Sequence, residues 1–92
     1  ENAKLYPGYF LTKGMRGQNV TDLQTYLNLI GKNIPEIPEV PVTGYFGDQT
    51  DEAVRIFQQL FGLPVNGDVG PVTWYQIALQ YDFLNRSVEN PE

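Results

Sequence analysis

The chain has 92 residues and a formal net charge of −5, and it contains neither cysteine nor histidine. The length fits one domain. The missing residue types exclude disulfides, thiol chemistry and histidine-based catalysis. We therefore expect no catalytic residue, no metal and no cofactor. The acidic charge argues against nucleic acid as a partner, and no apolar run is long enough to cross a membrane.

Proline and glycine are frequent in the first 18 residues, which predicts a loop with a short extended piece at residues 9–11. We place an N-terminal segment at 1–10, the domain itself at 11–84, and a C-terminal tail or linker at 85–92. The last residues are serine, valine, glutamate, asparagine and proline, a composition that suits a linker. We therefore expect the chain to be one module of a longer protein.

A first helix is expected from about 19 to 30. Asn19 suits the N-cap position, Asp22 favours the helix N-terminus, and Gly31 is expected to end the helix. The apolar residues at helical spacing are Val20, Leu23, Leu27 and Ile30.

The stretch that follows, 33–41, has three prolines at a three-residue interval. Such a stretch cannot form a helix interior, so it should cross the surface in an extended form. One edge of it is expected to pack against the core through Ile34, Ile37 and Val40.

Two further helices are expected after Gly47 and after Gly70. Asp48 would complement the helix dipole in the first turn of the earlier one, and Gly62 suits its C-terminal end. Pro71 is tolerated at the start of the later one, where its missing N–H has no helical partner. The inner faces comprise Ala53, Val54, Phe57, Leu60 and Phe61, and then Trp74, Ile77, Ala78 and Tyr81. Together these elements predict an all-α fold, a small three-helix bundle with turn-rich connecting loops.

A sequence repeat covers residues 42–54 and 65–77, with the pattern Val-x-Gly-x-apolar-Gly-x-x-Thr-x-x-x-apolar. We interpret its glycines and threonines as structural, because glycine adopts positive φ without strain and a threonine hydroxyl can satisfy backbone groups in the first helical turn. These residues are Gly44, Gly47, Thr50, Gly67, Gly70 and Thr73. At most a small ribbon is expected, where Val42 and Val65 would pair.

A weaker repeat links the first two helices. Val20-x-x-Leu23-Gln24-x-x-Leu27 matches Val54-x-x-Phe57-Gln58-x-x-Phe61. Each glutamine falls at the edge of the core stripe, where we expect its amide to bond the backbone of a neighbouring loop.

Three blocks of the chain share one family pattern. They are Gly14-x-x-Gly17-x-x-Val20-x-x-Leu23-Gln24-x-x-Leu27, then Val42-x-Gly44-x-Phe46-Gly47-x-x-Thr50-x-x-Ala53-Val54-x-x-Phe57-Gln58, then Gly62-Leu63-x-x-x-Gly67-x-Val69-Gly70-x-x-Thr73-Trp74. In this order they resemble the peptidoglycan-binding domain of bacterial cell-wall enzymes, over about Leu11 to Tyr81. The opening Tyr6-Pro7-Gly8 and the proline-rich insert resemble the versions found in Gram-positive spore-forming bacteria.

This resemblance implies a three-helix, non-catalytic module that anchors a cell-wall hydrolase or another surface protein to the bacterial wall. Its partners would be peptidoglycan, through glycan or stem peptide, and a covalently linked catalytic domain. Its place would be extracellular or in the cell wall, the spore included. A related domain in the propeptide of matrix metalloproteinases blocks zinc with a cysteine, which this chain lacks. The alternative function is a protein-interaction or pro-domain module that packs on its own catalytic partner.

The repeat contains two glycine loops, one around Gly44 and Gly47 and one around Gly67 and Gly70. The expected ligand site is a groove lined by these two glycine loops and the starts of the second and third helices. Free N–H groups at those helix starts would suit carboxylates or acetamido oxygens. The side chains expected there are Tyr45, Asp48, Asp68 and Tyr75, and Arg16 would add a carboxylate contact. Trp74 shares a helical face with apolar residues, so we interpret it as a core aromatic.

The acidic residues near the glycine loops do not suggest a glycosidase pair. The candidates would be Asp48, Asp51, Glu52 and Asp68. Acids near helix N-termini have a lowered pKa, and a general acid needs a raised pKa. No loop has the alternating aspartates of a calcium-binding hand.

Overall fold

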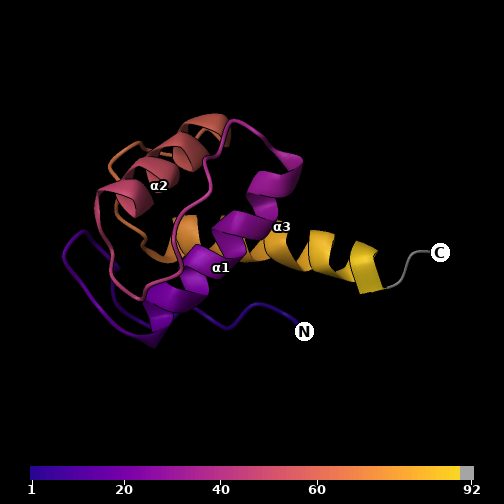
Figure 1. Ribbon diagram of the computed structural model, residues 1–92, viewed down its shortest axis with the longest axis horizontal. Coiled ribbons are helices and arrows are strands. Elements are labelled where there is room, and N and C mark those ends of the chain that lie inside the picture. The colour runs from indigo at the N-terminus through magenta and orange to yellow at the C-terminus, as the bar shows by residue number, and fades with distance from the viewer. Residues whose placement is uncertain (90–92) are drawn as a thin grey trace.

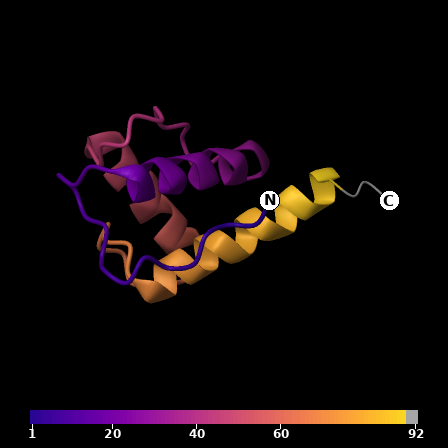
Figure 2. The same ribbon diagram turned by 90° about the horizontal axis from the view of Figure 1, so that it is seen from below.

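The computed structural model describes residues 1–89, which form three helices and no strand (Figure 1). They are α1 (Gln18–Asn33), α2 (Asp48–Leu60) and α3 (Pro71–Glu89). Figure 2 shows α1 and α3 farthest apart at one end of the molecule, where α2 lies between them, and closer together toward the other end. The predicted all-α, three-helix fold is confirmed. Within the described residues, no helix is long and apolar enough to span a membrane.

The core is built mainly from the helices, but loop residues contribute a substantial part of it. The helices supply Val20, Leu23, Tyr26, Leu27, Ile30, Ala53, Val54, Phe57, Trp74 and Ile77, and the loops supply Leu11, Ile37, Val40, Phe46 and Val69. Leu60, predicted for the inner face of α2, is 46% exposed, whereas Gln58 is fully buried. A small domain that needs loop side chains in its core must hold those loops precisely.

Helix α1 begins earlier and ends later than its sequence predicts. Gly17, with φ of 139°, is the N-cap and offers no side-chain cap. Asn19 is therefore inside the helix, where its Nδ2 donates to Tyr9 Oη at 2.8 Å. Gly31 does not end the helix. A Cβ there would lie 2.9 Å from the Ile37 carbonyl oxygen, so glycine instead allows the proline-rich stretch to approach closely.

The proline-rich stretch packs as predicted, with Ile37 and Val40 buried and Ile34 partly buried. Asn28 holds it to α1 through two hydrogen bonds. Its Nδ2 donates to the Val40 carbonyl at 2.8 Å, and its Oδ1 accepts from the Val40 N–H at 2.8 Å.

The predicted ribbon between Val42 and Val65 does not form, and each of these side chains is 50% exposed. Two isolated antiparallel bridges occur in other places, between Leu11 and Val69 and between Arg16 and Tyr45. Both bridges join the loop before α1 to a glycine loop. The pairing partners are therefore far apart in the sequence, which local alternation cannot indicate.

The N-terminal segment runs along α3 and ends beside its C-terminal half (Figure 2). The Ala3 N–H donates to Asp82 Oδ1 at 2.6 Å, and Trp74 Nε1 donates to the Lys4 carbonyl at 2.9 Å. At the other terminus, α3 continues through 85–89, which the sequence assigns to a tail or linker. The rest of that expected tail, 90–92, lies outside the described residues.

Candidate ligand-binding site

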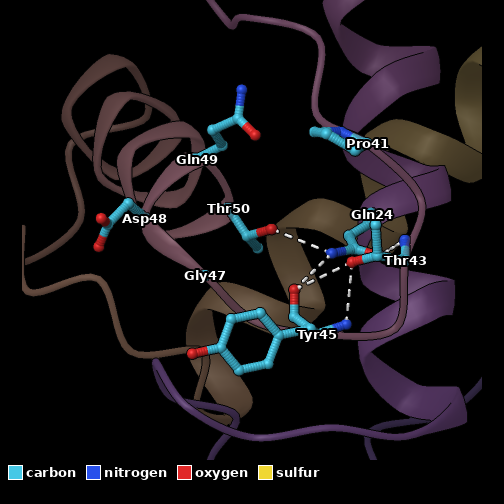
Figure 3. Close-up of a pocket in the computed structure, with 8 residues that line it drawn as sticks. All are labelled: Gln24, Pro41, Thr43, Tyr45, Gly47, Asp48, Gln49 and Thr50. Carbon is cyan, nitrogen blue, oxygen red and sulfur yellow. Dashed lines mark hydrogen bonds between the residues drawn. The ribbon is translucent and has the colours of Figure 1, made fainter.

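The first glycine loop is fixed by one buried side chain, Gln24 (Figure 3). Its Oε1 accepts from the N–H groups of Thr43 and Gly44, both at 2.9 Å. Its Nε2 donates to the Tyr45 carbonyl at 2.9 Å and to Thr50 Oγ1 at 3.1 Å. The amide of α1 thus ties the loop to the first turn of α2, as the position of the glutamine predicts.

Gln58 repeats this arrangement for the second glycine loop. Its Oε1 accepts from the N–H groups of Asn66 and Gly67, both at 3.0 Å. Its Nε2 donates to the Asp68 carbonyl at 3.0 Å and to Thr73 Oγ1 at 3.1 Å. Each loop is therefore fixed by the helix before it and joined to the helix after it.

Gly44, Gly67 and the threonines of the repeat take part in these two sets of glutamine hydrogen bonds, which we call the glutamine clamps. Gly44 and Gly67 have φ of 80° and 79°, a conformation that glycine adopts without strain. Thr50 and Thr73 accept hydrogen bonds from the glutamine amides, whereas the sequence suggests bonds to free backbone groups.

The first clamp forms the floor of an open hollow of about 400 Å³, which we call the first-repeat hollow. It is lined by Gln24, Pro41, Thr43, Tyr45, Gly47, Asp48, Gln49 and Thr50. Figure 3 shows Thr50 and Gln24 pointing toward each other, with the Tyr45 ring beside them and the Asp48 carboxylate turned away. The Tyr45 side chain is 38% exposed, and the Arg16 guanidinium carbon lies 4.3 Å from its ring centroid. A cation over the ring strengthens this flat platform.

Asp48 carries the acidic charge of this hollow. The hydrogen bond from Lys13, whose Nζ lies 2.5 Å from Asp48 Oδ1, lowers the pKa of the Asp48 carboxyl, and the positive charge of Lys13 adds to the effect. The pair is exposed, so it contributes little to folding. Asp48 therefore stays ionised and can only accept hydrogen bonds.

Replacing Lys13 with glutamine is expected to raise the pKa of Asp48 toward its ordinary value of 3.8, because the charged donor is lost. Carboxyl ¹³C shifts followed through an acid titration would measure it. Lys32→Gln removes an equal charge from the exposed end of α1 and should leave the Asp48 titration unchanged. An unchanged pKa in Lys13→Gln would contradict the ion pair.

The other candidate residues lie elsewhere. Asp68 lines the second-repeat hollow, which consists of Phe10, Pro64, Asn66, Asp68, Gly70, Pro71, Val72 and Thr73. Tyr75 lines the N-terminal hollow, which consists of Ala3, Lys4, Leu5, Tyr6, Pro71, Trp74, Tyr75, Ala78, Leu79 and Asp82. The structure thus brings Tyr45 and Asp48 together with Arg16 nearby, and it places Asp68 and Tyr75 in separate hollows. Trp74 is 2% exposed and holds its indole N–H in a hydrogen bond.

Sequence reasoning missed Pro41, Thr43, Gln49 and Phe10 as hollow residues. The repeat contained a clue for Thr43 and Gln49, which lie within the motif, and Pro41 directly precedes it, as Pro64 precedes the second copy. Phe10 offers none, because it reaches its hollow through the distant Leu11–Val69 bridge.

Residues 16–77 match the model of a family described as a peptidoglycan binding domain. The chain is 38% identical over 66 residues to a Bacillus licheniformis protein named "Probable N-acetylmuramoyl-L-alanine amidase", a match over 72% of this chain and 18% of that protein. It is 33% identical over 84 residues to the "Spore cortex-lytic enzyme" of Bacillus cereus, over 89% of this chain and 30% of the enzyme. The chain thus spans less than a third of the length of these relatives.

Among solved structures, the crystal structure of the SleB N-terminal domain superposes with a TM-score of 0.70 at 32% sequence identity. The alignment covers 83% of this chain and 97% of that domain. The likeness therefore extends over nearly the whole of that solved domain.

Proposed function

Since this chain belongs to the family of peptidoglycan-binding domains, we propose that it holds an attached cell-wall hydrolase on peptidoglycan. The observation that carries the proposal is the family match over residues 16–77, which spans both glutamine-clamped loops. Relatives named as an amidase and a cortex-lytic enzyme support a linked hydrolase. The same names support a place in the cell wall or the spore, outside the cytoplasm.

We place the binding site in the first-repeat hollow. It combines an exposed aromatic ring at Tyr45 with polar groups at Thr43, Asp48 and Gln49. A flat ring suits the apolar face of a sugar, and the polar groups suit its hydroxyls or the amides of a stem peptide. The net charge of −5 offers no long-range attraction to an anionic wall, so recognition is of short range.

We also propose that the module has no catalytic activity of its own. The sequence holds no histidine or cysteine, and the acid of the first-repeat hollow has a lowered pKa, which disfavours a general acid. Incubation of the domain with purified wall is expected to release neither reducing ends nor free amines. Release of either by the purified domain, at a rate that scales with its concentration, would overturn this part.

Replacing Tyr45 with alanine is expected to weaken co-sedimentation with insoluble peptidoglycan about tenfold in Kd, as the loss of one stacked ring at a centre of contact predicts. The thermal transition should stay near that of the parent chain, since Gln24 holds the loop by the Tyr45 backbone and not by the ring. Pelleting should be insensitive to salt and competed by soluble fragments.

Tyr75→Ala is the matched control, because Tyr75 is 61% exposed but lies in the N-terminal hollow. It should leave pelleting unchanged. Equal loss in both variants would move the site toward α3, and full retention in Tyr45→Ala would remove it from the first-repeat hollow.

A second candidate function is favoured by the N-terminal hollow, which is lined mainly by apolar groups. Leu5, Tyr75 and Leu79 are 92%, 61% and 47% exposed along it. Apolar surface of this kind suits packing against protein, so the domain would dock on its own catalytic partner there. If the unsubstituted chain fails to sediment with insoluble peptidoglycan at any concentration, this second candidate function replaces the first.

A further inference from the structure

We propose that the second-repeat hollow is a second peptidoglycan site, equivalent to the first, in which Phe10 takes the part of Tyr45. This inference rests on the proposed function and extends it from one site to two. The occupant is another repeating unit of the same polymer, with a sugar face on the Phe10 ring and a hydroxyl donating to Asp68.

The two hollows are built from equivalent positions of the repeat. The first is lined by 41, 43, 45, 47, 48, 49 and 50, together with Gln24. The second is lined by 64, 66, 68, 70, 71, 72 and 73, together with Phe10. Every position in the first set recurs in the second at a shift of 23 residues, and the loops are held by equivalent glutamine clamps. The two hollows are therefore built on equivalent positions of the repeat, and the loop of each is held in an equivalent way.

Each hollow also has an aromatic ring resting on the second glycine of its motif. In the first, a Cβ on Gly47 would come within 3.1 Å of the Tyr45 ring. In the second, the residue equivalent to Tyr45 is Asp68, which has no ring. Phe10 supplies one from the N-terminal segment, and a Cβ on Gly70 would overlap it. Each hollow thus has an aromatic ring beside its second glycine, supplied by the motif itself in the first and by the N-terminal segment in the second.

The Phe10 ring is exposed to solvent and is therefore available to a ligand. It is 55% exposed, whereas its neighbour Leu11 is 1% exposed and pairs with Val69 through two hydrogen bonds of 3.0 and 2.9 Å. Leu11 therefore anchors the segment, and this anchor fixes Phe10 beside Gly70. An exposed ring held in place loses little freedom when a ligand stacks on it.

The second hollow is smaller and less polar than the first, at about 230 Å³ against about 400 Å³. Pro71 and Val72 stand where the first hollow has Asp48 and Gln49. Its remaining charged group is Asp68, whose backbone is held by Gln58 and Asn66 and whose carboxylate accepts from a ligand hydroxyl. This lining suits the apolar face of a pyranose ring with one hydroxyl at its edge.

Two equivalent sites on one small domain suit a polymer of repeating units. When one site is occupied, the second meets neighbouring units of the same strand or network at high effective concentration. Binding to insoluble wall should then be far tighter than binding of one soluble unit to either hollow.

The test is titration of the purified chain with a soluble disaccharide-peptide fragment of peptidoglycan, followed by calorimetry and by amide NMR shifts. We expect two fragments per chain, with amide shifts at Gly47–Gln49 in the first hollow and at Gly70 and Val72 in the second. Phe10→Ala and Tyr45→Ala should each reduce the stoichiometry to one fragment per chain and weaken pelleting with insoluble wall about tenfold. The double variant should bind no fragment and should no longer pellet with the wall. Phe83→Ala, which removes a ring that is 66% exposed on α3, should change neither quantity.

One fragment per parent chain, with shifts confined to the first hollow and no change in Phe10→Ala, would overturn the second site while keeping the proposed function. No binding of wall by the parent chain would overturn both.

Discussion

Replacing Gln58 with leucine is expected to destabilise the fold by about 3 kcal/mol, because several buried polar groups lose their partner at once. Gln58 has no exposed surface, and it satisfies two N–H groups, at Asn66 and Gly67, together with the Asp68 carbonyl and the Thr73 hydroxyl. Leucine has a similar volume and fills the space, so the loss reflects hydrogen bonding and not a cavity. Urea unfolding would measure it as a shift of the midpoint.

Gln59→Leu is the matched control, since Gln59 is the next residue on α2 and is exposed. It should change the free energy of unfolding by less than about 0.5 kcal/mol. Gln58→Glu should also destabilise the fold, because a carboxylate cannot donate to the Asp68 carbonyl and its charge would be buried. Equal midpoints for Gln58→Leu and Gln59→Leu would show that the clamp contributes nothing to stability.

The helices and clamps could be predicted from the sequence because each depends on local spacing. Apolar residues recurring at helical intervals identify the inner faces of α1 and α3, and a glutamine beside such a face has few buried partners other than a loop. The observed ends of α1 differ from the predicted ones, because Asn19 and Gly31 serve contacts with Tyr9 and Ile37 from other segments instead of capping the helix. Such contacts override local propensity.

The candidate site was only partly predictable for the same reason. Tyr45 and Asp48 share a hollow because they belong to one turn of chain. Asp68 and Tyr75 were expected in the same groove, but Gln58 holds the loop of Asp68 beside its own hollow, and Tyr75 on α3 lines the hollow next to the N-terminal segment. The place of Phe10 depends on a bridge between Leu11 and Val69, which no local pattern encodes.

Removing residues 1–8 is expected to destabilise the domain by about 3 kcal/mol, although the family match begins only at residue 16. The segment gives the Trp74 indole its acceptor, the Lys4 carbonyl at 2.9 Å, and gives Tyr26 Oη a donor, the Lys4 N–H at 3.0 Å. The Tyr6 ring also packs edge-on to Trp74, with centroids 6.4 Å apart. Its loss therefore removes the acceptor of the indole N–H and exposes the Trp74 and Tyr26 rings to water.

Trp74 reports this change directly, because it is the chain's only tryptophan and is 2% exposed. In the truncated chain its emission should shift to longer wavelength below the melting transition, and the thermal midpoint should fall. Leu5→Ser is the control within the segment, since Leu5 is 92% exposed, and it should alter neither quantity. Because truncation keeps Phe10 and Leu11, the folded fraction should still bind wall. A truncated chain that melts with the parent and keeps its emission maximum would mean that the segment is not part of the folded core.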